Sequence, residues 1–169
     1  MKIRKLALCG LFAALLCISA WLAIPFGQLA FTMQTFAVSL CLYLLGGKLG
    51  CAAIFAYLLL GGIGLPVFSG FRGGLGVLLG ATGGYIFGFL GFGLVYWLIT
   101  AFFPKRQGVA MAAGLLVCYG CGTAWYSLMY LQGAGVGAIL LQSVLPYLAP
   151  DILKIVAALA VGKRLKRVV

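Results

Sequence analysis

Long runs of apolar residues recur along this chain, and they restrict its fold more than any other feature of the sequence. Crossing the hydrocarbon core of a bilayer takes roughly 20 helical residues, and the first run, residues 6–24, already has about that length. Of the 169 residues, 65% are hydrophobic and only 8% are charged. A water-soluble domain of this size cannot bury so much apolar surface. The sequence therefore predicts an all-α integral membrane protein that forms a single domain over residues 1–169.

The apolar runs predict six transmembrane helices, and turn residues separate them. A glycine-rich segment, residues 63–74, is expected to be non-helical, which the membrane interior tolerates only where protein or a water-filled cavity satisfies the backbone. Residues 133–137 are predicted to form a turn, and residues 138–145 a short interfacial helix. The predicted spans are residues 6–24, 31–45, 49–62, 76–103, 109–131 and a last one from Asp151 to the basic cluster that begins at Lys163.

Basic residues lie mainly in the connections between these runs and give the chain a net charge of +11. Lysine and arginine are enriched in the cytoplasmic connections of membrane proteins. The pattern therefore predicts a multi-pass protein of the cell membrane, in contact with lipid, with both termini in the cytoplasm. It does not form the basic stripe of a nucleic-acid-binding surface. The connection and terminal residues are Lys2, Arg4, Lys5, Lys48, Lys105, Arg106, Lys163, Arg164, Lys166 and Arg167.

Asp151 is the only acidic residue of the chain, and Lys154 follows it three positions later. Residues with this spacing share one face of a helix. Ionisable groups inside a membrane are costly and are candidates for a functional site. The alternative is that Asp151, directly after Pro150, only caps the N-terminus of the last helix.

Several polar and aromatic residues are expected at the outer ends of the spans. Arg72 is either a solvated loop charge or part of a site, and Thr32 and Gln34 either bond neighbouring backbone or face a ligand. Aromatic residues in this region belong either to the interfacial belt or to the wall of a pocket. These aromatic residues are Phe68, Phe71 and Tyr85.

Enzymatic functions have little support. The chain contains no histidine and a single carboxylate side chain, so it offers no acid–base pair, no metal-ligand set and no Ser–His arrangement. We therefore expect no metal and no cofactor. One alternative is a redox pair formed by Cys118 and Cys121 in a C-x-x-C motif, although cysteines within apolar runs usually serve as packing residues.

Four segments, taken together and in order, resemble the BioY family, the biotin-specific S components of energy-coupling-factor (ECF) transporters. The resemblance implies a membrane subunit, not an enzyme, that binds biotin from outside. It also implies partners, namely a transmembrane coupling subunit and two cytosolic ATPases that hydrolyse ATP. An S component for another small vitamin is the alternative. The segments are LGGKLG at 45–50, YLLLGGIGLPVFS at 57–69, GATGGY at 80–85 and PDILK at 150–154.

The resemblance also suggests roles for individual residues. Asp151 would accept from the ureido N–H groups of biotin, Lys154 would donate to the ureido carbonyl, and Arg72 would pair with the carboxylate. The reverse assignment, with Lys154 on the carboxylate, remains open. The further substrate-binding residues that we expect are Gln34, Thr32, Phe68, Ser69, Phe71 and Tyr85.

A second feature implied by the resemblance is a face of small residues on the first helix that docks the coupling subunit. Gly10 and Ala14 have small-x-x-x-small spacing, with Ala7 and Ala13 nearby. Small residues let two helices approach closely in lipid. The alternative is that these residues pack inside the bundle.

Overall fold

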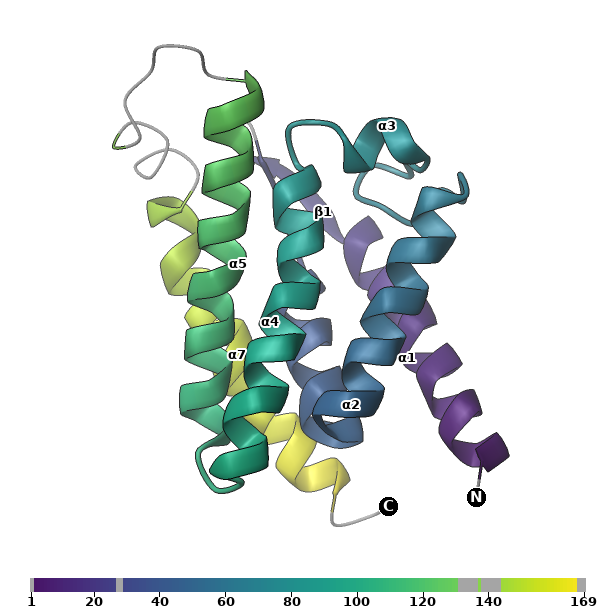
Figure 1. Ribbon diagram of the computed structural model, residues 1–169, viewed down its shortest axis with the longest axis vertical. Coiled ribbons are helices and arrows are strands. Elements are labelled where there is room, and N and C mark those ends of the chain that lie inside the picture. Colours follow the sequence, from purple (N-terminus) through teal and green to yellow (C-terminus); the bar gives the residue numbers. More distant parts are fainter. Residues whose placement is uncertain (1, 27–28, 131–136, 138–143, 167–169) are drawn as a thin grey trace.

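The computed structural model describes residues 2–26, 29–130, 137 and 144–166, and this part of the chain is predominantly helical (Figure 1). Five of its helices are long and apolar enough to cross a membrane, which supports the predicted class of fold. The helices are α1 Lys2–Trp21, α2 Gln34–Gly62, α3 Leu75–Leu78, α4 Gly83–Phe102, α5 Gln107–Tyr130 and α7 Leu145–Leu165.

Helix α2 is bent back on itself at Gly46, which has a positive φ of 78° inside the helix. The side-chain amide of Gln34 donates a hydrogen bond of 2.8 Å to the hydroxyl of Tyr57, 23 residues further along. In a straight helix these residues would be about 34 Å apart. Helix α2 is therefore a pair of antiparallel arms, 34–45 and 47–62, which match the predicted second and third runs.

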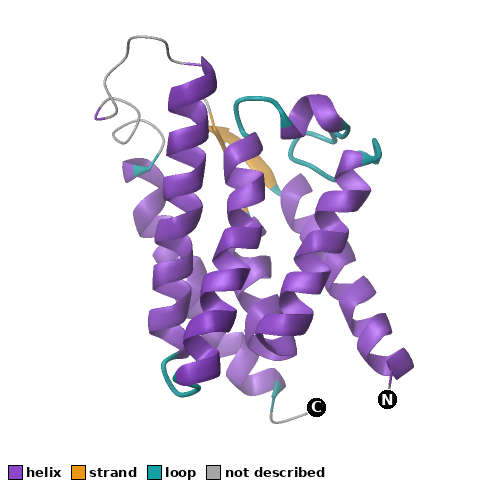
Figure 2. Cartoon of the chain, in the orientation of Figure 1, coloured by secondary structure: helices purple, strands orange, loops and turns teal. Residues whose placement is uncertain are grey.

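A two-stranded antiparallel hairpin connects α1 to α2, where no strand was predicted. Strand β1 (Ala23–Phe26) pairs with β2 (Leu29–Thr32), with Ala23 opposite Thr32. Figure 2 shows the hairpin in orange behind the helices. The predicted boundaries at residues 24 and 31 were wrong because Pro25 cannot continue a helix and the extended chain on either side satisfies its own backbone groups.

The segment 63–74 is non-helical, as predicted, but the fourth helix begins later than expected. Residues 75–78 form the separate short helix α3, and α4 starts only at Gly83. A side chain at Gly83 would overlap the carbonyl group of Leu78. The chain therefore turns tightly between these two residues, and the predicted continuous span over 76–103 is wrong in its first turns.

Helix α7 begins at Leu145, so Pro150 lies inside it and Asp151 lies beyond its first turn. The interpretation of Asp151 as a simple N-terminal cap is therefore wrong. A proline inside a helix removes one backbone hydrogen bond, which neighbouring groups compensate in membrane helices. The predicted turn over 133–137 and the interfacial helix over 138–145 lie almost entirely outside the described residues.

Close helix packing depends on glycine, as expected for a membrane bundle. On α4, a Cβ added at Gly88 would lie 2.9 Å from the Sγ of Cys118 on α5. On α5, a side chain at Gly114 would overlap the ring of Phe92. Helices α4 and α5 therefore approach each other more closely than larger residues would allow.

The two ends of the bundle are formed by different segments of the chain (Figure 1). One end contains the start of α1, the bend of α2, the α4–α5 connection and the end of α7. We call it the basic end, because it carries Lys48, Lys105, Arg106 and Lys163. The segment 63–82 lies at the opposite end, which we call the loop end.

Candidate functional site

A cavity of about 130 Å³ is lined by residues of β2, α2, α4, α5, α7 and the segment 63–82. It brings together nearly all the residues that the sequence suggested for binding, although they are far apart along the chain. Phe71 is the exception. The predicted residues around the cavity are Thr32, Gln34, Phe68, Ser69, Arg72, Tyr85, Asp151 and Lys154.

The charged centre of the cavity is the pair formed by Asp151 and Lys154 on α7. Lys154 Nζ lies 2.8 Å from Asp151 Oδ1, and each side chain is only 8% exposed. Withdrawing such a pair from water costs several kcal/mol per ion unless further hydrogen bonds compensate. The surroundings of the two residues supply these bonds.

The Lys154 ammonium is held from the side of the β hairpin. It donates a hydrogen bond of 2.7 Å to the main-chain carbonyl of Thr32, and it lies 3.7 Å from the centre of the Phe31 ring. A cation above an aromatic face is stabilised by about 0.5–2 kcal/mol. Strand β2 thus explains why a lysine is tolerated in an apolar helix, a contact that no pattern in the sequence indicates.

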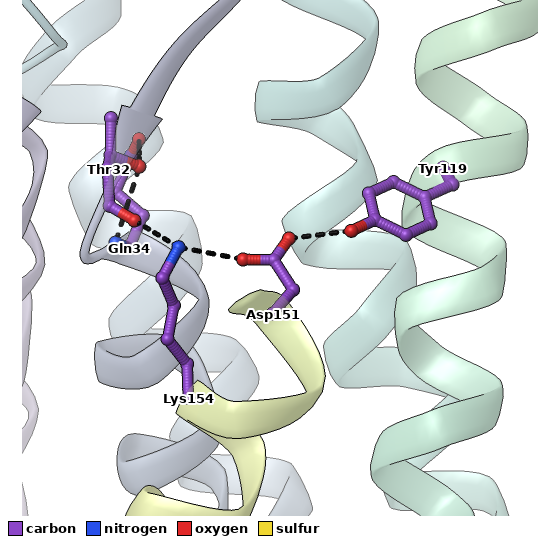
Figure 3. Close-up of polar contacts among 5 residues, drawn as sticks. All are labelled: Thr32, Gln34, Tyr119, Asp151 and Lys154. Atoms are coloured by element: carbon purple, nitrogen blue, oxygen red, sulfur yellow. Dashed lines mark hydrogen bonds and ion pairs between the residues drawn. The ribbon is translucent and has the colours of Figure 1, made fainter. Parts of the chain in front are cut away.

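The Asp151 carboxylate is held from the other side by α5. Its Oδ2 atom accepts a hydrogen bond of 2.7 Å from the Tyr119 hydroxyl, so the carboxylate lies between Tyr119 and Lys154 (Figure 3). Tyr119 was not among the residues predicted for the site, because the sequence marks it only as a residue between Cys118 and Cys121.

Thr32 and Gln34 begin a second set of polar contacts in the cavity. The Thr32 hydroxyl donates to Gln34 Oε1 at 3.1 Å, and Gln34 Nε2 donates to the Tyr57 hydroxyl at 2.8 Å. Tyr57 is fully buried, and among the described residues its own hydroxyl hydrogen has no acceptor. Tyr57, also absent from the predicted site, therefore presents a donor at the cavity wall.

The segment 63–74 contributes the wall at the loop end. The Phe68 ring is buried and packs edge-on against Tyr57 with 5.5 Å between ring centres. The Phe68 amide donates to the Arg72 carbonyl at 2.9 Å, and Arg72 Nε donates to the Ser69 carbonyl at 3.1 Å. Arg72 is exposed, so the other N–H groups of its guanidinium remain available at the mouth.

Phe71, which was predicted either for the interfacial belt or for the pocket wall, does not line the cavity. Its side chain is 66% exposed and stacks on Trp21 at the end of α1, with 5.2 Å between ring centres. Phe71 has a positive φ of 56°, a backbone conformation that is rare for a bulky residue. This turn directs the side chain outward, toward Trp21.

The cysteines of the C-x-x-C motif lie in different surroundings. Cys118 is buried and its thiol donates to the Tyr85 carbonyl at 3.5 Å. Cys121 is exposed on α5, and both are free thiols. The buried position of Cys118 fits a packing residue.

The small residues of α1 separate into two groups. Ala7, Gly10 and Ala14 are exposed, and nothing lies within 4 Å of a Cβ added at Gly10. Ala13 is only 3% exposed and belongs to the core, as the alternative of packing inside the bundle predicted. Internal packing applies to Ala13, and the other three residues form an open face.

Comparison with known proteins gives matches over the full length of the chain. The BioY family model matches residues 1–169. The biotin transporter BioY of Thermotoga maritima is 38% identical, with 97% of this chain and 96% of that protein covered. The probable biotin transporter BioY of Pyrococcus horikoshii is 36% identical, with 98% of each chain covered.

One solved structure shares the fold. It is described as the S-component for biotin from an ECF-type ABC transporter, and the TM-score is 0.88 at 24% sequence identity, over 98% of this chain and 92% of that chain. The apolar helices and these relatives make the chain a multi-pass protein of the cell membrane. Because the family model matches residues 1–169, the chain belongs to the BioY family.

Proposed function

We propose that this chain is the biotin-binding S component of an ECF importer and that it takes up biotin from the outside of the cell. The observation that carries the proposal is the buried pair of Asp151 and Lys154 in an otherwise largely aromatic and apolar cavity. Sites for small molecules combine such walls with a few polar groups that fix orientation. The chain is a transport subunit and not an enzyme, and ATP hydrolysis belongs to its partners.

The charged pair matches the ureido group of biotin. In this cyclic urea each N–H donor lies beside the carbonyl acceptor. Asp151 and Lys154 present a carboxylate acceptor and an ammonium donor side by side, with 2.8 Å between Oδ1 and Nζ. The carboxylate accepts from an N–H group, and the ammonium donates to the carbonyl in place of one of its present contacts.

The valerate carboxylate of biotin is then assigned to Arg72 at the mouth of the cavity. A guanidinium binds carboxylates through two parallel hydrogen bonds, and the N–H groups of Arg72 that do not bond Ser69 are available for them. The reverse assignment would place the biotin carboxylate beside Asp151. Two carboxylates at such a short distance repel each other, which favours the first arrangement.

The orientation in the membrane follows from the distribution of charge. With the two arms of α2 counted separately, α1, α4, α5 and α7 complete six crossings. The positive-inside rule places the basic end in the cytoplasm, so both termini lie inside and the cavity opens to the outside. The arms are shorter than a typical span, which a locally thinner bilayer accommodates.

The open face of α1 is assigned to the coupling subunit. Ala7, Gly10 and Ala14 are exposed and would let a partner helix approach the α1 backbone closely. The coupling subunit would in turn connect the S component to two cytosolic ATPases.

Titration calorimetry with the purified full chain in detergent tests the substrate. We expect one biotin per chain, and no heat with riboflavin or thiamine. Binding of one of these vitamins in place of biotin would identify an S component of different specificity. A folded protein that binds none of the three would refute the proposed function.

A further inference from the structure

A second hollow lies at the basic end, remote from the biotin cavity. It is a recess of about 370 Å³ between the bend of α2, the ends of α4 and α7, and the start of α5. The proposed transport function does not use it. Its polar lining residues are Tyr43, Tyr96, Thr100, Gln107 and Lys166.

Two buried tyrosines line this recess without a hydrogen-bond partner. Tyr43 is 7% exposed and Tyr96 is 2% exposed. In the part of the chain that the structure describes, neither hydroxyl donates to or accepts from another group. Both residues line the recess, so the two hydroxyls are available to donate to a ligand there.

The recess is positively charged. Lys166 Nζ lies 4.5 Å from the centre of the Tyr43 ring, so the ammonium is held against one wall. Asp151 is the only acidic residue of the chain, and it is bonded to Lys154 and Tyr119 in the other cavity. The protein thus provides no acidic side chain to pair with Lys166, and the ammonium is available to an anionic ligand in the recess.

The start of α5 adds to this preference for an anion. Gln107, its first residue, lines the recess. The first N–H groups of a helix lack intrahelical partners, and the helix dipole favours negative charge there. Tyrosine hydroxyls, free helix N–H groups and an ammonium together form the donor set that a phosphate group requires.

We propose that this recess binds the phosphate group of an anionic phospholipid of the cytoplasmic leaflet. The assignment to that leaflet rests on the orientation given under the proposed function. Basic pockets between transmembrane helices on the cytoplasmic side bind anionic lipid headgroups. A lipid is favoured over free phosphate because its acyl chains stay in the bilayer and keep the headgroup at the level of the helix ends.

Native mass spectrometry of the full chain tests this proposal. The detergent-solubilised protein is titrated with phosphatidylglycerol and, separately, with phosphatidylcholine. We expect one phosphatidylglycerol to bind in preference to phosphatidylcholine. The double substitution Tyr43→Phe/Tyr96→Phe removes only the two hydroxyls and should weaken this binding at least about 100-fold, because two hydrogen bonds to a charged group are lost.

The role of the Lys166 charge is tested with two matched lysine substitutions in the last turns of α7. Both lysines are exposed. Lys166→Gln removes the ammonium that lines the recess, whereas Lys163→Gln removes one from the same helix end that does not line it. Lys166→Gln should weaken phosphatidylglycerol binding several-fold and Lys163→Gln less than twofold. Equal effects of the two substitutions, or no effect of the tyrosine substitutions, would overturn the proposal.

A competition experiment separates the two sources of phosphate. Inorganic phosphate at millimolar concentration should not displace phosphatidylglycerol, and displacement would show that the recess serves a soluble anion instead of a lipid. The readout is the mass of bound lipid and needs no biotin, so it stands even if the substrate proves to be another vitamin. Unchanged thermal unfolding of the variants, followed by circular dichroism, shows that they are folded.

Discussion

The Lys154 ammonium and the Thr32 carbonyl, 122 residues apart in the chain, are joined by a hydrogen bond of 2.7 Å. This bond connects the last helix to the hairpin between the first two. Lys154 is bonded at the same time to Asp151 at 2.8 Å, so one ammonium links two distant segments. Substitutions around this contact give the most direct tests of the site.

Replacing Lys154 with methionine should weaken biotin binding by about 100-fold. The change leaves Asp151 buried without its counter-charge, and loss of one partner from a buried charge pair costs about 2–5 kcal/mol. Titration calorimetry measures the effect, with Lys163→Met on the same helix as the control. An affinity within threefold of the wild type would contradict the assigned role of Lys154.

The substitution Tyr119→Phe should weaken biotin binding about 10-fold. It removes only the hydroxyl that donates to Asp151 Oδ2, and a hydrogen bond to a charged group is worth about 1.5–3 kcal/mol. Tyr126→Phe on the same helix, outside the cavity lining, is the matched control. Equal affinities of the two variants would show that Tyr119 does not position the carboxylate.

Arg72→Gln should remove the preference for the charged form of the ligand. Wild-type protein is expected to bind biotin at least about 10-fold more tightly than neutral biotinamide, since a charge-assisted pair adds about 1.5–3 kcal/mol. The variant should bind both with similar affinity. If the preference persists, the carboxylate lies elsewhere, and Lys154 becomes its partner.

Ala14→Leu should abolish transport and leave binding intact, because a bulky side chain on the open face of α1 blocks close approach of the coupling subunit. Uptake of labelled biotin by cells that express the complete transporter is compared with binding to the purified chain. Ala112→Leu, at an exposed position of α5, should affect neither. Normal uptake by the Ala14 variant would exclude this face as the docking surface.

Substitution of the buried neighbour Ala13 should affect the stability of the fold, unlike substitution of the exposed Ala14. Ala13→Leu inserts extra volume into a packed core, which typically costs about 1–3 kcal/mol. We expect it to lower the thermal stability of the purified chain, and Ala14→Leu to leave it unchanged. Thermal unfolding followed by circular dichroism distinguishes the two. Equal melting temperatures would mean that Ala13 is not tightly packed.

The apolar runs and basic connections were sufficient to predict the helices, because both follow from the cost of placing polar groups in lipid. The three-residue spacing of Asp151 and Lys154 also predicted that the two would share a helix face. The true start of α7 at Leu145 was missed because Pro150 was taken as a helix boundary, as it would be in water. Inside a bundle, neighbouring groups compensate for the lost bond.

Contacts between distant segments could not be predicted. Tyr119 and Phe31 carry no sequence pattern that points toward α7, yet they lie on either side of its charged pair. The outward turn of Phe71 depends on a backbone angle and on the position of Trp21. Such contacts form only when the helices pack together, so a single sequence does not show which distant residues contact each other.

The contacts of Lys154 have a consequence for how a ligand binds. An ammonium has three N–H groups, and here they face the Asp151 carboxylate, the Thr32 carbonyl and the Phe31 ring. A carbonyl oxygen of an incoming ligand gains a donor only when Thr32 or Phe31 gives one up. Binding at Lys154 is thus a substitution reaction in which the main chain of the hairpin acts as an intramolecular competitor, and the ligand affinity reflects the difference between two similar bonds.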